Sequence, residues 1–135
     1  MWCLTQYIKV TKLDDKACFA LAVTKYNGCM MLACGIDNEM KVWNSDDDFQ
    51  EHWKLCSHGI RSLEWITSND KLCIVIGSED GMEVWEMESK RNIFSIKQDS
   101  GINAIRVIER EGHACLLTGD CNTKIMLWED SSIDE

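Results

Sequence analysis

The feature that most constrains this chain is a tetrapeptide that recurs three times at a nearly constant interval. Residues 40–43 read MKVW, residues 82–85 read MEVW and residues 125–128 read IMLW. The closing residues Trp43, Trp85 and Trp128 are 42 and then 43 positions apart, and Trp2 stands 41 positions before the first of them. Periods of roughly 40 to 45 residues belong to few architectures. We therefore expect a repeat protein.

Each repeat has the pattern of four short antiparallel strands. Short apolar runs at 30–33, 72–76 and 114–117 precede turns that carry Gly with Asp or Asn, the chemistry of tight hairpins. Upstream of these runs, residues 60–66 and 102–108 alternate apolar with polar side chains, which is strand spacing, and residues 19–23 take the same place in the first repeat. After the tryptophans, further strands are expected at 51–56 and 91–97.

These patterns predict an all-β fold and a division of the whole chain, residues 1–135. We expect units at about 16–57, 58–98 and 99–130, an outer strand at 3–10 without a unit of its own, and an acidic tail at 131–135.

Composition excludes several classes of protein. With 45% hydrophobic residues, 135 residues are enough to build a core. The net charge of −9 and the scattered Lys and Arg argue against a nucleic-acid partner, because phosphates are bound by clustered basic residues. No run approaches the roughly 18 apolar residues of a membrane span, and the N-terminus lacks a secretory pattern. We expect a protein of the cytoplasm, with the nucleus as the other possibility, and no membrane partner.

Four-stranded units of this length, in which a Gly- and Asp-bearing turn precedes a strand ending in Val-Trp or Leu-Trp, resemble the WD-repeat β-propeller family. The pattern departs from the family where Asn44, Glu86 and Glu129 follow the tryptophans in place of Asp. The resemblance implies blades held by a hydrogen-bonded network, and the residues at the matching positions are Trp43, Trp85, Trp128, Asp37, Asp80, Asn122, His58 and Ser78. It also implies protein or peptide recognition at the positions of Arg61, Asn103, Ile36, Glu79 and Cys121.

Three units are too few for a closed propeller, which has about four to eight blades. Either two copies exchange their outer strands and form a six-blade ring, or another WD-repeat chain supplies the remaining blades, or the sequence is a fragment. In each case these residues supply a partial propeller of three blades. A lone piece of this size is expected to expose its apolar blade faces and aggregate, because each repeat buries its faces only against neighbours.

The sequence shows no established catalytic motif, so we expect a non-catalytic interaction scaffold without a cofactor or a metal. Five of the eight cysteines are expected in the core as reduced thiols, namely Cys18, Cys29, Cys34, Cys73 and Cys115. The alternative is a thiol- or zinc-dependent enzyme, with Cys56 and His58 as nucleophile and base, or with zinc on His113, Cys115 and Cys121.

Overall fold

The computed structural model describes residues 1–5, 17–47 and 50–130 of the chain. Within these residues the fold is all-β: the strands form three antiparallel sheets, and the one helical turn is the 3-10 turn Ser45–Asp47. None of the described residues belongs to a helix with the length and apolar character needed to cross a membrane. The all-β prediction is therefore confirmed.

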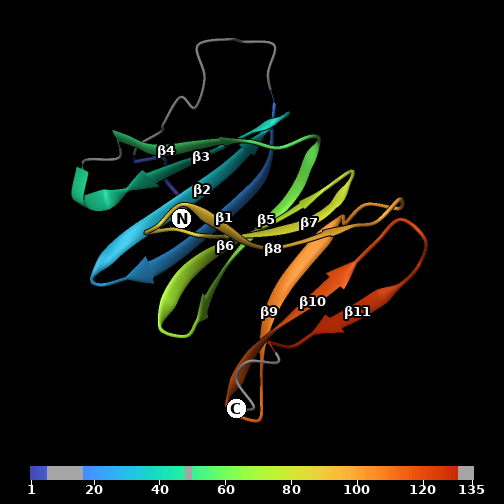
Figure 1. Ribbon diagram of the computed structural model, residues 1–135. Coiled ribbons are helices and arrows are strands. Elements are labelled where there is room, and N and C mark those ends of the chain that lie inside the picture. The colour runs from blue at the N-terminus through green and yellow to red at the C-terminus, as the bar shows by residue number, and fades with distance from the viewer. Residues whose placement is uncertain (6–16, 48–49, 131–135) are drawn as a thin grey trace.

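The three sheets follow one another along the chain, and in each the strands pair in sequence order (Figure 1). Sheet A contains β1 (Cys18–Tyr26), β2 (Cys29–Ile36), β3 (Glu39–Asn44) and β4 (Gln50–Cys56). Sheet B contains β5 (Ile60–Ser68), β6 (Lys71–Ser78), β7 (Gly81–Glu86) and β8 (Arg91–Lys97). Sheet C contains β9 (Ala104–Arg110), β10 (His113–Gly119) and β11 (Ile125–Trp128).

The hairpins form where the sequence has turn residues. Between β1 and β2, Asn27 and Gly28 have φ angles of 52° and 81°, and between β5 and β6, Asn69 and Asp70 have φ angles of 52° and 63°. Two successive positive φ angles define the type I′ turn, whose twist matches that of the flanking strands. Turn chemistry thus fixes the register of the first hairpin in each of these sheets.

The two ends of the chain lie wholly or partly outside the described residues. Of the outer strand expected at 3–10, residues 3–5 have no regular structure and the remainder lies outside the described residues, as does the acidic tail at 131–135. Sheet C has three strands among the described residues, and β11 ends at Trp128.

The pairing registers of the strands align the three sheets residue by residue. In each sheet the repeated tryptophan pairs with an apolar residue of the second strand: Trp43 with Leu32, Trp85 with Ile74 and Trp128 with Leu116. We call residues that take the same place in these ladders register counterparts. The tight turns then align Asn38, rather than the expected Asp37, with Asp80, because Ile36 pairs with Glu39 where Ser78 pairs with Gly81.

The sheets pack face to face, with β5 lying between β1 and β9 (Figure 1). We call the face that packs on the preceding sheet the leading face, and the face that packs on the following sheet the trailing face. One core lies between sheets A and B and contains Ala22, Val42, Leu63 and Ile74; the other lies between sheets B and C and contains Val75 and Ile105. Alternation along each strand supplies apolar side chains to both faces.

Candidate functional site

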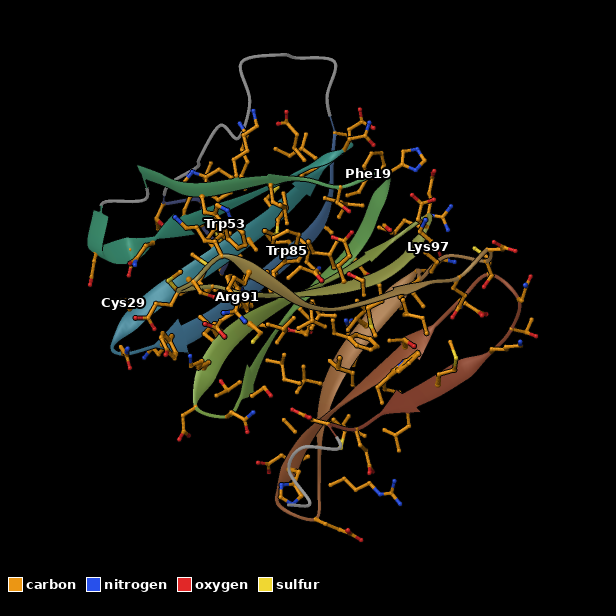
Figure 2. All side chains as sticks on the ribbon, in the orientation of Figure 1. Phe19, Cys29, Trp53, Trp85, Arg91 and Lys97 are labelled. Atoms are coloured by element: carbon orange, nitrogen blue, oxygen red, sulfur yellow. The ribbon has the colours of Figure 1, made fainter. Side chains whose placement is uncertain are left out.

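The repeated tryptophans contact the preceding sheet in the same way in sheets B and C. Trp85 meets Trp53 of β4 edge to face, with ring centroids 6.2 Å apart and an interplanar angle of 62° (Figure 2). Trp128 meets Phe94 of β8 with centroids 6.2 Å apart and an angle of 63°. Such edge-to-face pairs add stability beyond the area that they bury. The third strand of one sheet is therefore joined to the fourth strand of the sheet before it.

Trp43 lies differently from its two counterparts. It is buried in a small cluster with Cys34 and Ile36, against which Leu32 packs. Ile36 was expected on the peptide-binding surface, but its burial in this cluster leaves it 3% exposed. Ile36 is therefore not available to a ligand in this structure.

The hydrogen-bonded network expected around Asp80 is incomplete. His58 Nδ1 lies 3.2 Å from Asp80 Oδ2, yet both side chains are exposed, and Ser78 Oγ accepts from the Asp80 backbone N–H at 3.2 Å. Trp85 Nε1 donates to Glu83 Oε2 at 2.9 Å and not to the Ser78 hydroxyl. The residues therefore form a surface pair and a turn contact instead of one buried network.

Sheet C contains a hydrogen bond from its tryptophan to a hydroxyl, although the hydroxyl belongs to Thr118, the register counterpart of Ile76 and not of Ser78. Trp128 Nε1 donates to Oγ1 of the buried Thr118 at 2.9 Å. Asp120 accepts from Ser100 Oγ at 3.0 Å. Ser100 stands as far before Ile105 as His58 stands before Leu63, the register counterpart of Ile105. Backbone N–H groups of Lys124 and Asn122 lower the pKa of Asp120, and its contact with Ser100 acts in the same direction. The sequence analysis assigned the turn position of the hydrogen-bonded network to Asn122, which is exposed. Asp120 could have been found from its place directly after β10.

Four of the five residues expected to bind a peptide meet at one end of sheets B and C. Arg61 Nη1 donates to Asn103 Oδ1 at 2.8 Å and to Cys121 Sγ at 3.2 Å, and Asn103 Nδ2 donates to the same sulfur at 3.0 Å. Arg61 Nη2 lies 3.8 Å from Glu79 Oε1. We call these four residues the polar rim.

The polar rim continues through His58 and depends on two glycines. His58 Nε2 lies 3.6 Å from Glu79 Oε2. A Cβ at Gly59 would come within 2.6 Å of the Glu79 side chain, and a Cβ at Gly101 would come within 3.0 Å of Arg61 Nη1. Both glycines have positive φ angles, 61° and 69°. Backbone without side chains thus makes room for a carboxylate and a guanidinium side by side, so that the polar rim offers both hydrogen-bond acceptors and donors.

The residues of the proposed zinc site do not come together. His113 and Cys121 lie at or beyond opposite ends of β10, whose seven residues span roughly 20 Å, and Cys115 is buried. In the described part of the chain no group of three or more His, Cys, Asp or Glu side chains is arranged to hold a metal ion. The side chain of Cys56, the expected nucleophile beside His58, lies outside the described residues.

The cysteines expected in the core divide into two groups. Cys34, Cys73 and Cys115 are buried, whereas Cys18 is exposed and Cys29 is half-buried. Cys18 Sγ lies 2.7 Å from Cys34 Sγ across β1 and β2. Burial, together with this contact, raises the pKa of Cys34 to about 12. The expectation of a core position is therefore wrong for Cys18, which lies next to the irregular pairing at the start of β1.

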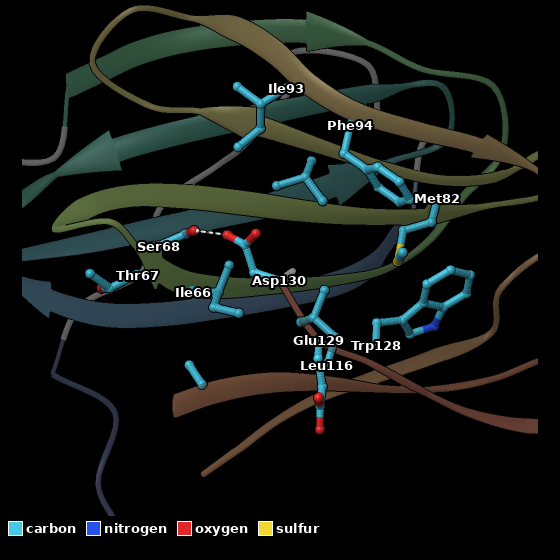
Figure 3. A pocket seen from close by; sticks show the side chains of 12 residues that line it. Ile66, Thr67, Ser68, Met82, Ile93, Phe94, Leu116, Trp128, Glu129 and Asp130 are labelled. Carbon is cyan, nitrogen blue, oxygen red and sulfur yellow. Dashed lines mark hydrogen bonds between the residues drawn. The ribbon is translucent and has the colours of Figure 1, made fainter. Parts of the chain in front are cut away.

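A groove of about 280 Å³ lies between sheets B and C (Figure 3). Its apolar lining includes Met82, Phe94 and Trp128, and at its edge Ser68 Oγ donates to Asp130 Oδ2 at 2.8 Å. The corresponding space between sheets A and B is filled, because the register counterparts there are bulkier: Leu72 for Ala114, Tyr26 for Ser68 and Met87 for Asp130. Smaller and polar residues thus open the groove.

Apolar side chains are exposed on the two outermost faces of the array. The leading face of sheet A exposes Leu21, Val23 and Met30, and the trailing face of sheet C exposes Ile125 and Leu127. Rows of exposed apolar residues on one sheet face are typical of surfaces that bind protein.

No protein-family model matches this chain, and no curated protein matches it at a significant level of similarity. The interpretation of these sites therefore depends on the geometry of the chain itself.

Proposed function

We propose that the three sheets are blades of a partial WD-repeat-type β-propeller, and that the chain is a non-catalytic scaffold for protein–protein interaction within a larger assembly. The observation that carries this proposal is the pair of exposed apolar faces at the two ends of the array. The residues on them have register counterparts that are buried between sheets inside the same chain. A repeat of this kind buries its faces only against neighbouring repeats. We therefore expect further sheets of the same kind to cover the two outer faces.

The covering sheets come from a second copy, from another WD-repeat chain, or from further repeats of a longer chain of which these residues are a part. The polar rim then lies at one end of the array, where Arg61 and Glu79 face solvent together and Asn103 and Cys121 hold the guanidinium. Loops and strand ends on a rigid scaffold commonly carry recognition residues. We assign the rim to contact with a protein or peptide of mixed charge.

The proposal is tested by native mass spectrometry of the chain purified under non-denaturing conditions from the cells that make it. We expect a mass well above the 15.5 kDa of one chain. Leu21→Glu places a carboxylate on the leading face of sheet A and is expected to release the 15.5 kDa monomer. Lys97→Glu, an exposed change on β8, is the matched control and leaves the assembly intact. A folded monomer for the unaltered chain would contradict the proposal.

A further inference from the structure

The contact between neighbouring sheets occurs twice in the chain, once between sheets A and B and once between sheets B and C. Its trailing half is the trailing face of the earlier sheet, and its leading half is the leading face of the later sheet. On the trailing face, Met40, Met82 and Ile125 are register counterparts, because they pair with Gly35, Gly77 and Gly119. Met40 is 0% exposed and Met82 is 1% exposed, whereas Ile125 is 76% exposed. The trailing half is therefore covered in sheets A and B and open in sheet C.

On the leading face the exposed sheet is sheet A, and sheets B and C are covered. Leu21, Leu63 and Ile105 are register counterparts, because they pair with Cys34, Ile76 and Thr118. Leu63 is 4% exposed and Ile105 is 1% exposed, whereas Leu21 is 66% exposed. Sheet A thus presents an uncovered leading half, and sheet C presents an uncovered trailing half.

A glycine and an isoleucine form the closest part of the repeated contact. A Cβ at Gly35 would lie 2.7 Å from Ile60 Cγ2, and a Cβ at Gly77 would lie 2.9 Å from Ile102 Cγ2. Each glycine lets the first strand of the next sheet approach, because no side chain intervenes. The third glycine of this series, Gly119, would meet nothing within 4 Å.

The residue missing from this series is present at the other end of the chain. Cys18 is the counterpart of Ile60: Cys18 pairs with Ile36 as Ile60 pairs with Ser78. Ile60 is buried against Gly35, whereas Cys18 is exposed. An unfilled position at Gly119 in sheet C therefore matches an uncovered side chain in sheet A.

We propose that a second copy of this chain covers both open halves. The leading face of sheet A of the second copy packs on the trailing face of sheet C, with Cys18 of the second copy against Gly119, and the reverse contact closes a two-fold ring of six sheets. This deepens the proposed function and rests on it. A second copy is favoured as the occupant because the chain carries both halves of the contact, so two copies cover all four open halves. Such a head-to-tail interface ends in a closed ring once the rotation closes.

Disulfide trapping tests the register directly. A Cβ at Gly35 lies 3.5 Å from Ile60 Cβ, within the spacing of about 3.5–4.5 Å that a disulfide requires. The change Gly119→Cys therefore places a thiol opposite Cys18 of the second copy. Oxidised glutathione is the oxidant: two protein thiols lose two protons and two electrons as one S–S bond forms, and one glutathione disulfide is reduced to two thiols.

The trapping variant also carries Cys34→Ala, which removes the thiol that lies 2.7 Å from Cys18 Sγ. We expect a covalent dimer whose peptide map joins position 119 to Cys18, and its loss when Cys18→Ser is added. Gly119→Cys alone, checked by circular dichroism, guards against misfolding of the double variant. Gly112→Cys is the matched control, because Gly112 also has open space around it but lies in the turn at the far end of β10. Position 119 joined to position 119, or equal trapping from Gly112→Cys, would overturn the register.

Sedimentation equilibrium of the purified chain under reducing conditions gives the second readout. We expect twice the 15.5 kDa of one chain, and a shift to the monomer for Gly119→Val with circular dichroism unchanged. A folded monomer at every concentration overturns the second copy as occupant. It leaves the proposed function standing if the assembly isolated from cells contains a different chain, so the two failures are distinguishable.

Discussion

The trailing faces of sheets B and C carry the same pattern of apolar positions, but only the first is covered within the chain. Met82 and Ile125 hold one register position, and they are 1% and 76% exposed. Residue type does not explain the difference, since both side chains are large and apolar. Burial is decided by whether another sheet follows in space. The comparison shows that one sequence pattern is core in one repeat and an exposed apolar face in the next.

Truncating the two counterparts gives the largest contrast. Met82→Ala removes a fully buried side chain between sheets B and C and is expected to lower the free energy of unfolding by about 3 kcal/mol. Ile125→Ala removes an exposed side chain and is expected to change it by less than about 0.5 kcal/mol. Urea denaturation of dilute protein measures both. Equal effects would mean that Ile125 is covered within its own chain.

The glycine series gives the next largest contrast. Gly77→Ala places a methyl group against the Ser62 hydroxyl and Ile102 and is expected to cost about 2 kcal/mol of stability. In dilute protein, where the chain is a monomer, Gly119→Ala has open space and is expected to be neutral or slightly stabilising, since alanine restricts the unfolded chain. The urea midpoints of the two variants, each compared with that of the unaltered chain, measure these changes in stability. A loss of stability in Gly119→Ala that matches that of Gly77→Ala would remove the distinction between inner and outer faces.

The Thr118–Trp128 hydrogen bond distinguishes sheet C from sheet B. Thr118→Val keeps the shape of the buried side chain but removes the acceptor of the Trp128 indole N–H, at an expected cost of about 1 kcal/mol. Thr67→Val changes an exposed threonine of β5 and serves as the control. If thermal unfolding shows no difference between the two variants, the bond does not contribute to the stability of sheet C.

Two buried thiols are expected to make the stability of the chain depend on alkaline pH. Burial raises the pKa of Cys34 to about 12 and that of Cys73 to about 11, from an ordinary value of 9.0. The folded chain then holds protons that the unfolded chain releases above pH 9, so stability is full below pH 9 and falls as the pH rises toward 11. Urea midpoints between pH 8 and pH 10.5 measure the slope, and Cys73→Ala is expected to make it shallower. An unchanged slope would show that Cys73 ionises as easily when folded.

Much of the arrangement followed from local pattern. The period of the tryptophans, the alternation at 60–66 and the Asn-Gly turn at 27–28 identify strands and hairpins, since these depend on neighbouring residues in the chain. The polar rim was predicted as separate positions along a repeat. Its contacts, such as Arg61 with Cys121, join residues 60 positions apart and depend on the packing of sheet B on sheet C.

The sequence by itself determined which residues alternate, where the chain turns and that the same unit recurs, because hydrophobic period and turn chemistry act over a few residues. Only the tertiary structure decided that Cys18 and Leu21 are exposed while Ile60 and Leu63 are buried, and that Asn38 rather than Asp37 aligns with Asp80. The physical reason is that burial depends on the neighbouring sheet. Leu21 and Leu63 have the same chemistry and the same register, but Leu63 is packed between sheets A and B whereas Leu21 is exposed among the described residues.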